Sequence, residues 1–210
     1  MRRREPAVLL ALGVVLLVLS GIHPKDRYTW ILEVAPAIAA AILLVATYRR
    51  FPLTPLAYRL ILVHACILML GGHYTYAEVP LGFWVQRALG LARNHYDRLG
   101  HFAQGFVPAI LAREILLRKT PLRRGGWTFF LVTCVCLAIS AFYEFVEWWT
   151  ALASGEAATA FLGTQGDVWD TQWDMFCALI GAVVAQLTLS RVHDRQLAAL
   201  PAPSSPAPAR

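Results

Sequence analysis

Six long stretches of apolar residues alternate along the chain with short polar connections. The stretches lie at about residues 6–22, 30–48, 56–74, 99–117, 127–150 and 169–190. A helix needs about 20 mostly apolar residues to cross the hydrocarbon core of a bilayer, and each stretch approaches this length. The pattern therefore predicts an all-α, polytopic membrane helix bundle with about six transmembrane helices, folded as one domain over residues 1–192.

The first apolar stretch runs from Pro6 to Ile22 and follows the basic start Arg2-Arg3-Arg4. This order of segments also resembles a secretory signal peptide. The apolar run is long, however, and no small-x-small cleavage site follows it, so we expect an uncleaved helix. The topology of the remaining helices is the same in either case.

Two segments are not expected to span the membrane. The long connection at residues 77–98 contains a part, Gly82 to Arg93, that mixes Phe83 and Trp84 with polar side chains. This mixture favours a helix lying in the membrane interface, and a re-entrant turn is the alternative. Residues 193–210 are rich in proline and alanine towards their end, and we expect a disordered cytoplasmic tail there.

The composition also indicates a membrane protein. Only 15% of the residues are charged and 58% are hydrophobic, whereas soluble domains average about 25% charged residues. The formal net charge is +6, but a basic excess in such an apolar chain more often sets membrane orientation than it binds nucleic acid. We therefore expect the lipid bilayer as a partner and no nucleic acid, and the sequence leaves the oligomeric state open.

The basic residues are distributed unevenly over the connections. Connections on the side of both termini contain twelve Lys and Arg residues, and those on the other side contain five. Because basic connections resist translocation, both termini should be cytoplasmic in a bacterial inner membrane. Six of the seven tryptophans lie near the opposite boundary, where indole rings anchor at the membrane interface.

Ionisable side chains gather near the outer boundary of four predicted spans, although such residues are costly inside a membrane and indicate functional sites by default. They are His73, His95, Asp97, His101, Glu144, Glu147, Asp167, Asp170 and Asp174. Asp97 and His101 are four positions apart and can share a helix face, as can Glu144 and Glu147, which are three apart. Helices of opposite direction bring these residues to one depth, so we expect one polar cluster near the outer face.

So many carboxylates cannot stay ionised and unpaired at a site of low dielectric constant, and they need protons, arginines or a metal ion. Carboxylates and imidazoles without thiolates suit a divalent cation. The candidate metal ligands are His73, His95, His101, Glu147, Asp167, Asp170 and Asp174. The candidate catalytic residues are Asp97, His101, Glu144, Asp170 and Asp174. With a bound cation, such a site could hydrolyse or transfer a lipid-linked or phosphate-bearing envelope substrate.

Other interpretations of the cluster stay open. The acids could pair with polar neighbours and simply fasten four helices together. The neighbours available for such pairs are Arg98, Gln104, Gln165 and Gln172. The carboxylates could instead couple proton movement to transport, although no inverted repeat is visible. Haem binding, for which His64, His73 and His101 are available, is the least expected.

Some polar residues have simpler structural explanations. Asp167 or Asp170 could cap the sixth helix, where a negative charge meets the positive end of the helix dipole. We expect Glu33 to belong to an interfacial group with nearby aromatic residues. We expect Arg113, Glu114, Arg118 and Lys119 to lie at a solvated inner helix end.

Four blocks of this sequence occur together in a known family. They are residues 72–76, 94–102, 143–148 and 166–175, which read GHYTY, NHYDRLGHF, YEFVEW and GDVWDTQWDM. In these blocks the chain resembles the YjdF-type family of bacterial inner-membrane proteins, and the match extends over about residues 10–190. The resemblance implies a multi-pass inner-membrane protein and supplies no reaction.

The chain is more distantly similar to VanZ-like membrane proteins, whose pattern is an acid-Lys-x-x-His-Phe helix start, a later Glu and an Asp-x-x-x-Asn helix. The matching residues are Asp97, His101, Phe102, Glu144, Asp170 and Gly181. The chain departs from the pattern at Arg98, Asp174 and Cys177, where that family has Lys, Asn and often Gly. This resemblance implies a role at the cell envelope and one polar constellation on the outer side.

Overall fold

The protein is an all-α membrane helix bundle, described here by a computed structural model that covers residues 4–155 and 159–200. The helices are α1 (Glu5–Ser20), α2 (Arg27–Thr47), α3 (Pro55–Tyr74), the short 3-10 helix η1 (Tyr76–Glu78), α4 (Pro80–Leu89), α5 (Tyr96–Lys119), α6 (Gly126–Ser154), α7 (Thr159–Leu162) and α8 (Asp170–Ala198). The expected helical fold class is therefore confirmed.

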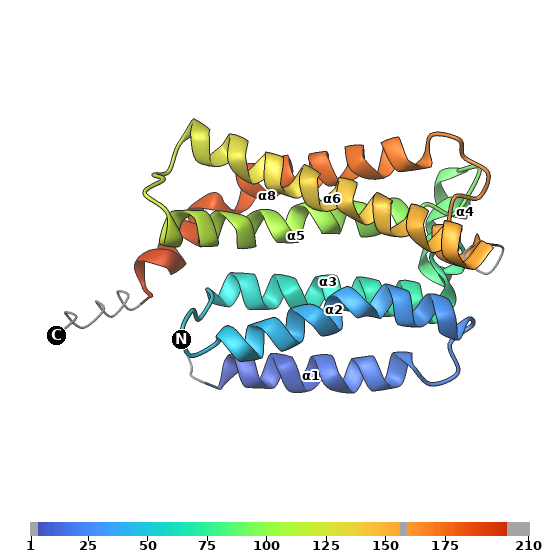
Figure 1. The fold of residues 1–210 in the computed structure, drawn as a ribbon, viewed down its shortest axis with the longest axis horizontal. Helices are drawn as coiled ribbons and strands as arrows, with labels where there is room; N and C mark the ends of the chain where they lie inside the picture. The colour runs from blue at the N-terminus through green and yellow to red at the C-terminus, as the bar shows by residue number, and fades with distance from the viewer. Residues whose placement is uncertain (1–3, 156–158, 201–210) are drawn as a thin grey trace.

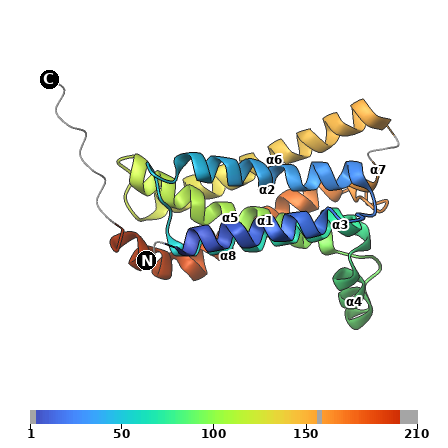
Figure 2. The ribbon, with the colours of Figure 1, turned by 90° about the horizontal axis from the view of Figure 1, so that it is seen from below.

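The long helices form two groups of three (Figure 1). One group contains α1, α2 and α3, the other contains α5, α6 and α8, and α3 packs against α5 where the groups meet. Consecutive long helices run in opposite directions. We call the end with α4 and the start of α8 the α4 end, and the end with the start of α1 and the end of α8 the terminal end. Figure 2 shows α4 projecting from the bundle at the α4 end.

In the described part of the chain, four helices are long and apolar enough to cross a membrane, namely α2, α3, α6 and α8, and α1 is a shorter apolar helix. At most 28% of the apolar window of each of the four is buried inside the protein. Large apolar side chains such as Val63, Phe130 and Leu187 point outwards and are exposed. An apolar outer surface is what a bundle surrounded by lipid tails requires.

Helices α5 and α8 approach each other closely because two glycines lie between them. A Cβ atom on Gly105 would lie 1.8 Å from the carbonyl oxygen of Ala178, and one on Gly181 would lie 2.1 Å from that of Phe102. Small residues permit such backbone contact in membrane helices, where van der Waals packing drives association. This contact fixes the register of α5 against α8, and with it the positions of the polar residues at both ends.

Local sequence signals explain how several helices begin. Asp26 caps α2 by accepting a hydrogen bond from the backbone N–H of Thr29 at 2.6 Å. Thr54 caps α3 by accepting from Ala57 N at 3.3 Å, and Pro55 occupies the first helical position, which suits its fixed φ angle. The starts of α5 and α8 have no side-chain cap.

The helix boundaries differ from the sequence prediction in two places. The connection after α3 contains α4 at Pro80–Leu89 rather than at residues 82–93. Helix α8 continues to Ala198, past residue 192, where we placed the end of the membrane domain. Residues 201–210 lie outside the described residues, so the disordered tail stays a prediction.

Candidate functional site

His101, in the second turn of α5, is the centre of a buried polar cluster at the α4 end, and only 5% of it is exposed. Its Nε2 atom lies 3.5 Å from Asp97 Oδ1 and 3.9 Å from Asp174 Oδ2. Its Nδ1 atom lies 3.9 Å from Glu144 Oε1. Residues from α5, α6 and α8 therefore meet at one imidazole ring, as the spacing of the acids predicted.

Gln104, one turn further along α5, contacts one ring nitrogen of His101 and orients the ring. Its carbonyl oxygen lies 3.1 Å from Nδ1, and a carbonyl oxygen can only accept a hydrogen bond. A neutral ring therefore has its proton on Nδ1, and its free lone pair on Nε2 faces Asp97 and Asp174. Metal-binding histidines are commonly oriented in this way, with the second nitrogen donating to an oxygen.

The ligand atoms around His101 have the spacing of a metal coordination sphere. Two groups, Asp97–His101–Asp174 and His101–Glu144–Glu147, each offer ligand atoms within 4.8 Å of one another. Ligands bound about 2.0–2.2 Å from a divalent ion at tetrahedral angles lie about 3.4 Å apart, close to the distances between Nε2 and its two carboxylates. These distances are too long for ordinary hydrogen bonds.

Two buried carboxylate oxygens in the cluster have no hydrogen-bond partner within the described part of the chain. They are Oδ1 of Asp174 and Oε1 of Glu144, and neither residue is more than 7% exposed. Burying a carboxylate oxygen without a partner is costly. Both the donor set and these free oxygens fit a divalent cation.

Asp167 and Asp170 have a different environment, because arginines neutralise them. Arg93 Nη2 donates to Asp167 Oδ2 at 2.9 Å and to Asp170 Oδ1 at 3.0 Å. Arg98 Nη2 also donates to Asp167 Oδ2, at 3.0 Å. Neither aspartate belongs to the two groups around His101. These ion pairs connect Asp167 and Asp170, at the start of α8, to Arg93 and Arg98, at the start of α5. A structural role in holding the helices together therefore explains these two aspartates.

The glutamines that were expected to pair with the acids make other contacts. Gln104 holds His101 rather than an acid, and Gln165 Nε2 donates to the backbone oxygen of Asn94 at 2.8 Å. Arg93, which makes the most contacts to the acids, was not among the expected partners. It lies in a connection, where the hydrophobic pattern does not indicate which way a side chain points. Its only sequence signal is its position just before a helix that is rich in polar residues.

His73 and His95 also lie apart from the ligand groups. His73 Nδ1 lies 2.9 Å from the backbone oxygen of Ser20, and this contact ties the end of α3 to the end of α1. His95 occupies the N-cap position of α5. Burial, and then the charges of Arg98 and Arg93, lower the pKa of His95. An imidazole beside two guanidinium groups is therefore neutral at physiological pH.

Glu33 was expected in an interfacial group, and this prediction is wrong, because the residue is buried inside the bundle with 5% of its surface exposed. A Cβ atom on Gly72 of α3 would lie 3.0 Å from Glu33 Cβ, so this acid of α2 is packed against α3. Its sequence signal is a single acid in an otherwise apolar helix.

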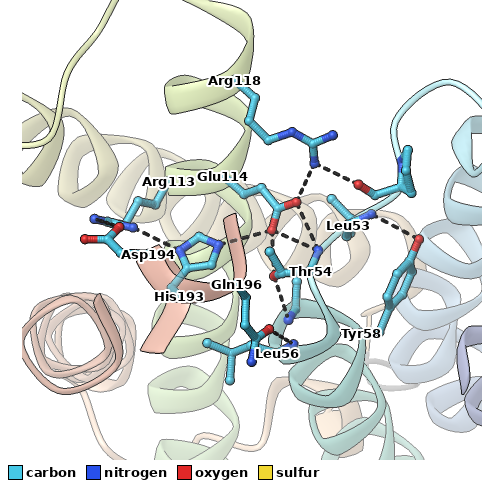
Figure 3. A network of polar contacts seen from close by, with 12 residues as sticks. Leu53, Thr54, Leu56, Tyr58, Arg113, Glu114, Arg118, His193, Asp194 and Gln196 are labelled. Atoms are coloured by element: carbon cyan, nitrogen blue, oxygen red, sulfur yellow. Dashed lines mark hydrogen bonds and ion pairs between the residues drawn. The ribbon is translucent and has the colours of Figure 1, made fainter. Parts of the chain in front are cut away.

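A second polar network lies at the terminal end, around the fully buried Glu114 of α5 (Figure 3). Its carboxylate accepts hydrogen bonds from Thr54 N at 3.1 Å, Thr54 Oγ1 at 2.7 Å and Arg118 Nη1 at 2.6 Å. His193 Nε2 also donates to it, at 3.1 Å. On the other side of His193, Arg113 Nη1 donates to Nδ1 at 3.1 Å, and Arg113 pairs with Asp194 at 2.7 Å.

The expectation of a solvated helix end is therefore wrong for Arg113 and Glu114, whereas Lys119 is exposed. Helix α8 is longer than the apolar run indicated, and it carries His193 against α5, so the polar residues of both helices are covered. Because a guanidinium group only donates, His193 must accept at Nδ1 and carry its proton on Nε2. The network joins the start of α3 to α5 and α8.

Comparisons with known proteins give two matches. The model of a family described as "Predicted membrane protein (DUF2238)" matches residues 5–195. The "Inner membrane protein YjdF" of Escherichia coli (strain K12) is 60% identical over 183 residues, which cover 87% of this chain and 88% of that protein. No solved structure matches the chain.

Proposed function

Since the chain belongs to the DUF2238 family of inner-membrane proteins, we propose that it is a divalent-cation-dependent membrane enzyme that hydrolyses a phosphate ester of a lipid-linked substrate. The family resemblance expected from four sequence blocks is confirmed, and it supplies a membrane location without a reaction. The reaction must therefore be inferred from the site. The single observation that carries the proposal is the set Asp97, His101 and Asp174, which has metal-ligand spacing and a free buried carboxylate oxygen.

Different residues of this chain would hold the cation and contact the phosphate. Asp97, His101 and Asp174 would hold the cation, while Gln104 keeps the His101 ring in the orientation that presents Nε2. Arg98 has a buried Nε atom without a partner in the described part of the chain, and this N–H could donate to a phosphate oxygen. The bound cation would supply Lewis-acid polarisation of the phosphoryl oxygen and a more acidic water.

The proposal places six spans across the membrane, with α1 and α5 added to the four long apolar helices. Helix α1 has 16 residues and would extend about 24 Å, which is short but uncharged after its first residue. Helix α5 has 24 residues and would extend about 36 Å, with His101, Arg113 and Glu114 buried inside the bundle. The basic residues of the terminal end favour a cytoplasmic location for both termini.

This orientation makes a prediction about the two ends of α6. A topology reporter inserted at Gly155 should report the extracytoplasmic side, and one inserted at Thr120 should report the cytoplasm, because α6 runs between these positions. Paired alkaline phosphatase and green fluorescent protein fusions measure this directly. The reverse pattern would place the His101 cluster on the cytoplasmic side and remove the envelope substrate from the proposal.

The metal content of matched aspartate variants tests the function itself. Wild-type protein, purified in detergent without chelators, should contain about one divalent metal ion per chain by elemental analysis, and it should release inorganic phosphate from dioctanoyl phosphatidic acid. Asp174→Asn should lose the metal and the activity, because it removes a ligand oxygen. Asp167→Asn should keep the metal, because its carboxylate pairs with arginines.

An absorption spectrum of the same wild-type sample tests for haem. Wild-type protein without metal would contradict the ligand set. Equal metal content in Asp174→Asn and Asp167→Asn would contradict it as well. In that case, fastening of the helices or proton coupling would explain the acids better.

A further inference from the structure

Helices α1, α2 and α3 form an apolar groove in the half of the bundle that does not contain His101. Both α1 and α2 pack along α3, but they make few contacts with each other. The space between them has a volume of about 340 Å³ and is lined by residues of all three helices. Ligand pockets typically have about 300–1,000 Å³, and the space between the helices of a bundle is one of their usual locations.

The lining of this groove is apolar along nearly its whole length. Of its 18 lining residues, only Tyr48 and Tyr58 have an oxygen or nitrogen atom in the side chain. The lining extends from Pro6 to Leu17 on α1, which corresponds to about 16 Å along the helix. Atoms that line an open space lose dispersion contacts, which an apolar molecule would restore. In a bilayer, unbranched acyl chains surround the helices, and a long apolar groove suits one of them.

The two tyrosines place the polar atoms of the groove at the terminal end. Tyr48 follows the last residue of α2, Tyr58 lies in the first turn of α3, and their ring centroids are 6.4 Å apart. The hydroxyl group of Tyr58 accepts a hydrogen bond from Leu53 N at 3.2 Å. The groove is therefore polar at one end and apolar along the rest, as a phospholipid is.

An ion pair joins the starts of α1 and α3 at the same end. Arg59, which follows Tyr58, contacts Glu5 Oε1 with Nη2 at 2.6 Å and donates to it from Nε at 2.7 Å. Glu5 is the only acid among residues 1–25 and 34–77, which include all of α1 and α3. Because Arg59 occupies this acid, the other basic residues at this end of the groove have no acid nearby in the sequence.

Three of these basic residues are Arg4, Arg49 and Arg50. Arg4 is the N-cap residue of α1, two positions before Pro6, and Arg49 and Arg50 directly follow Tyr48. All three are exposed. None of them forms an ion pair within residues 4–155 and 159–200. Guanidinium groups bind phosphate through paired hydrogen bonds, and basic pockets between membrane helices bind anionic head groups.

We propose that this groove binds one acyl chain of an anionic phospholipid, whose phosphate group contacts Arg49 and Arg50 at the terminal end. The acyl chain fills the space between α1 and α2 and connects these two helices through apolar contacts. The arginines favour a head group with a net negative charge over a zwitterionic one. The phosphate site belongs to the terminal end, whereas the His101 cluster lies at the α4 end, so this lipid site does not depend on the proposed hydrolysis.

Lipid binding by variants of the groove tests the position of the acyl chain. Delipidated protein in detergent is titrated with dioleoyl phosphatidylglycerol and followed by native mass spectrometry and a melting curve. Wild-type protein should form a one-to-one complex and melt at a higher temperature, because the lipid binds the folded state. Ala41→Phe fills the groove and should lose the complex. Ala39→Phe changes an exposed residue of the same helix that does not line the groove, and it should bind as the wild type does.

The choice of head group tests the arginines. Wild-type protein should bind dioleoyl phosphatidylglycerol more tightly than dioleoyl phosphatidylcholine, which has the same chains and no net charge. Arg49→Gln combined with Arg50→Gln should weaken phosphatidylglycerol binding by about 10- to 30-fold and leave phosphatidylcholine binding unchanged. Arg123→Gln combined with Arg124→Gln removes the same charge from the connection before α6, which does not line the groove, and should keep the preference.

Each other outcome contradicts a specific part of the proposal. Equal affinity for the two lipids, or an unchanged preference without Arg49 and Arg50, overturns the phosphate site. An Ala41→Phe protein that binds phosphatidylglycerol like the wild type overturns the groove as the position of the chain. If Ala41→Phe does not fold, Ala65→Leu decides, because it narrows the same groove from α3. Wild-type protein that dimerises and binds no lipid would show that a second copy covers the groove instead.

Discussion

Replacement of His101 by alanine is expected to abolish stoichiometric binding of a divalent cation and, with it, phosphate release. Both ligand groups of the cluster contain this one ring, so no alternative set of three ligands remains in the described part of the chain. The variant should still fold, because the glycine contacts between α5 and α8 do not involve the imidazole. Elemental analysis and a melting curve of the same detergent sample measure both properties.

Gln104→Leu provides a graded control for the same site. It removes the acceptor that fixes the His101 ring but leaves the ring in place, so metal affinity should fall by about 10- to 100-fold while full occupancy is still reached at excess metal. A titration with Mn²⁺ distinguishes the two variants. Stoichiometric metal in His101→Ala would show that the cation, where bound, is held elsewhere.

Replacement of Glu114 by alanine is expected to give the largest loss of stability, about 3–5 kcal/mol in the free energy of unfolding. The carboxylate is fully buried, and its removal leaves Arg118, His193 and the Thr54 donors without their common acceptor. Three helices lose their connection at the terminal end. Unfolding in a denaturing detergent series, followed by circular dichroism, measures the effect.

Glu78→Ala is the control for the Glu114 prediction. It removes an acid whose ion pair with Lys25 is about half exposed, and such pairs contribute about 0–1 kcal/mol. Equal destabilisation of the two variants would contradict a special role for the buried network. A second comparison, His193→Ala combined with Glu114→Ala, should cost less than the sum of the single changes, because the two side chains share one hydrogen bond.

The hydrophobic pattern was sufficient to predict the fold class and the approximate extent of the long helices. Apolar runs of membrane length have few alternatives, because backbone groups in a bilayer must be satisfied within the segment. The gathering of acids at one end was also predictable. Antiparallel helices bring Asp97, Glu144 and Asp174 to the same depth whatever their lateral arrangement.

The spacing of the acids could not predict which of them pair with arginines and which face His101. Asp170 and Asp174 are both acids on consecutive turns of α8, yet Arg93 neutralises the first, while the second faces His101. The same limit applies to Glu33 and Glu114. One was assigned to an interface and the other to solvent, because a sequence does not indicate which helix will cover a polar side chain.

The sequence by itself thus determined a multi-pass helical membrane protein with a polar end, because length, hydropathy and helix direction are properties of single segments. Only the tertiary structure decided which acids are paired, which are free and which are buried. Those properties depend on lateral packing, above all on the contact of α5 with α8 through Gly105 and Gly181, which sets the distance between side chains from different helices.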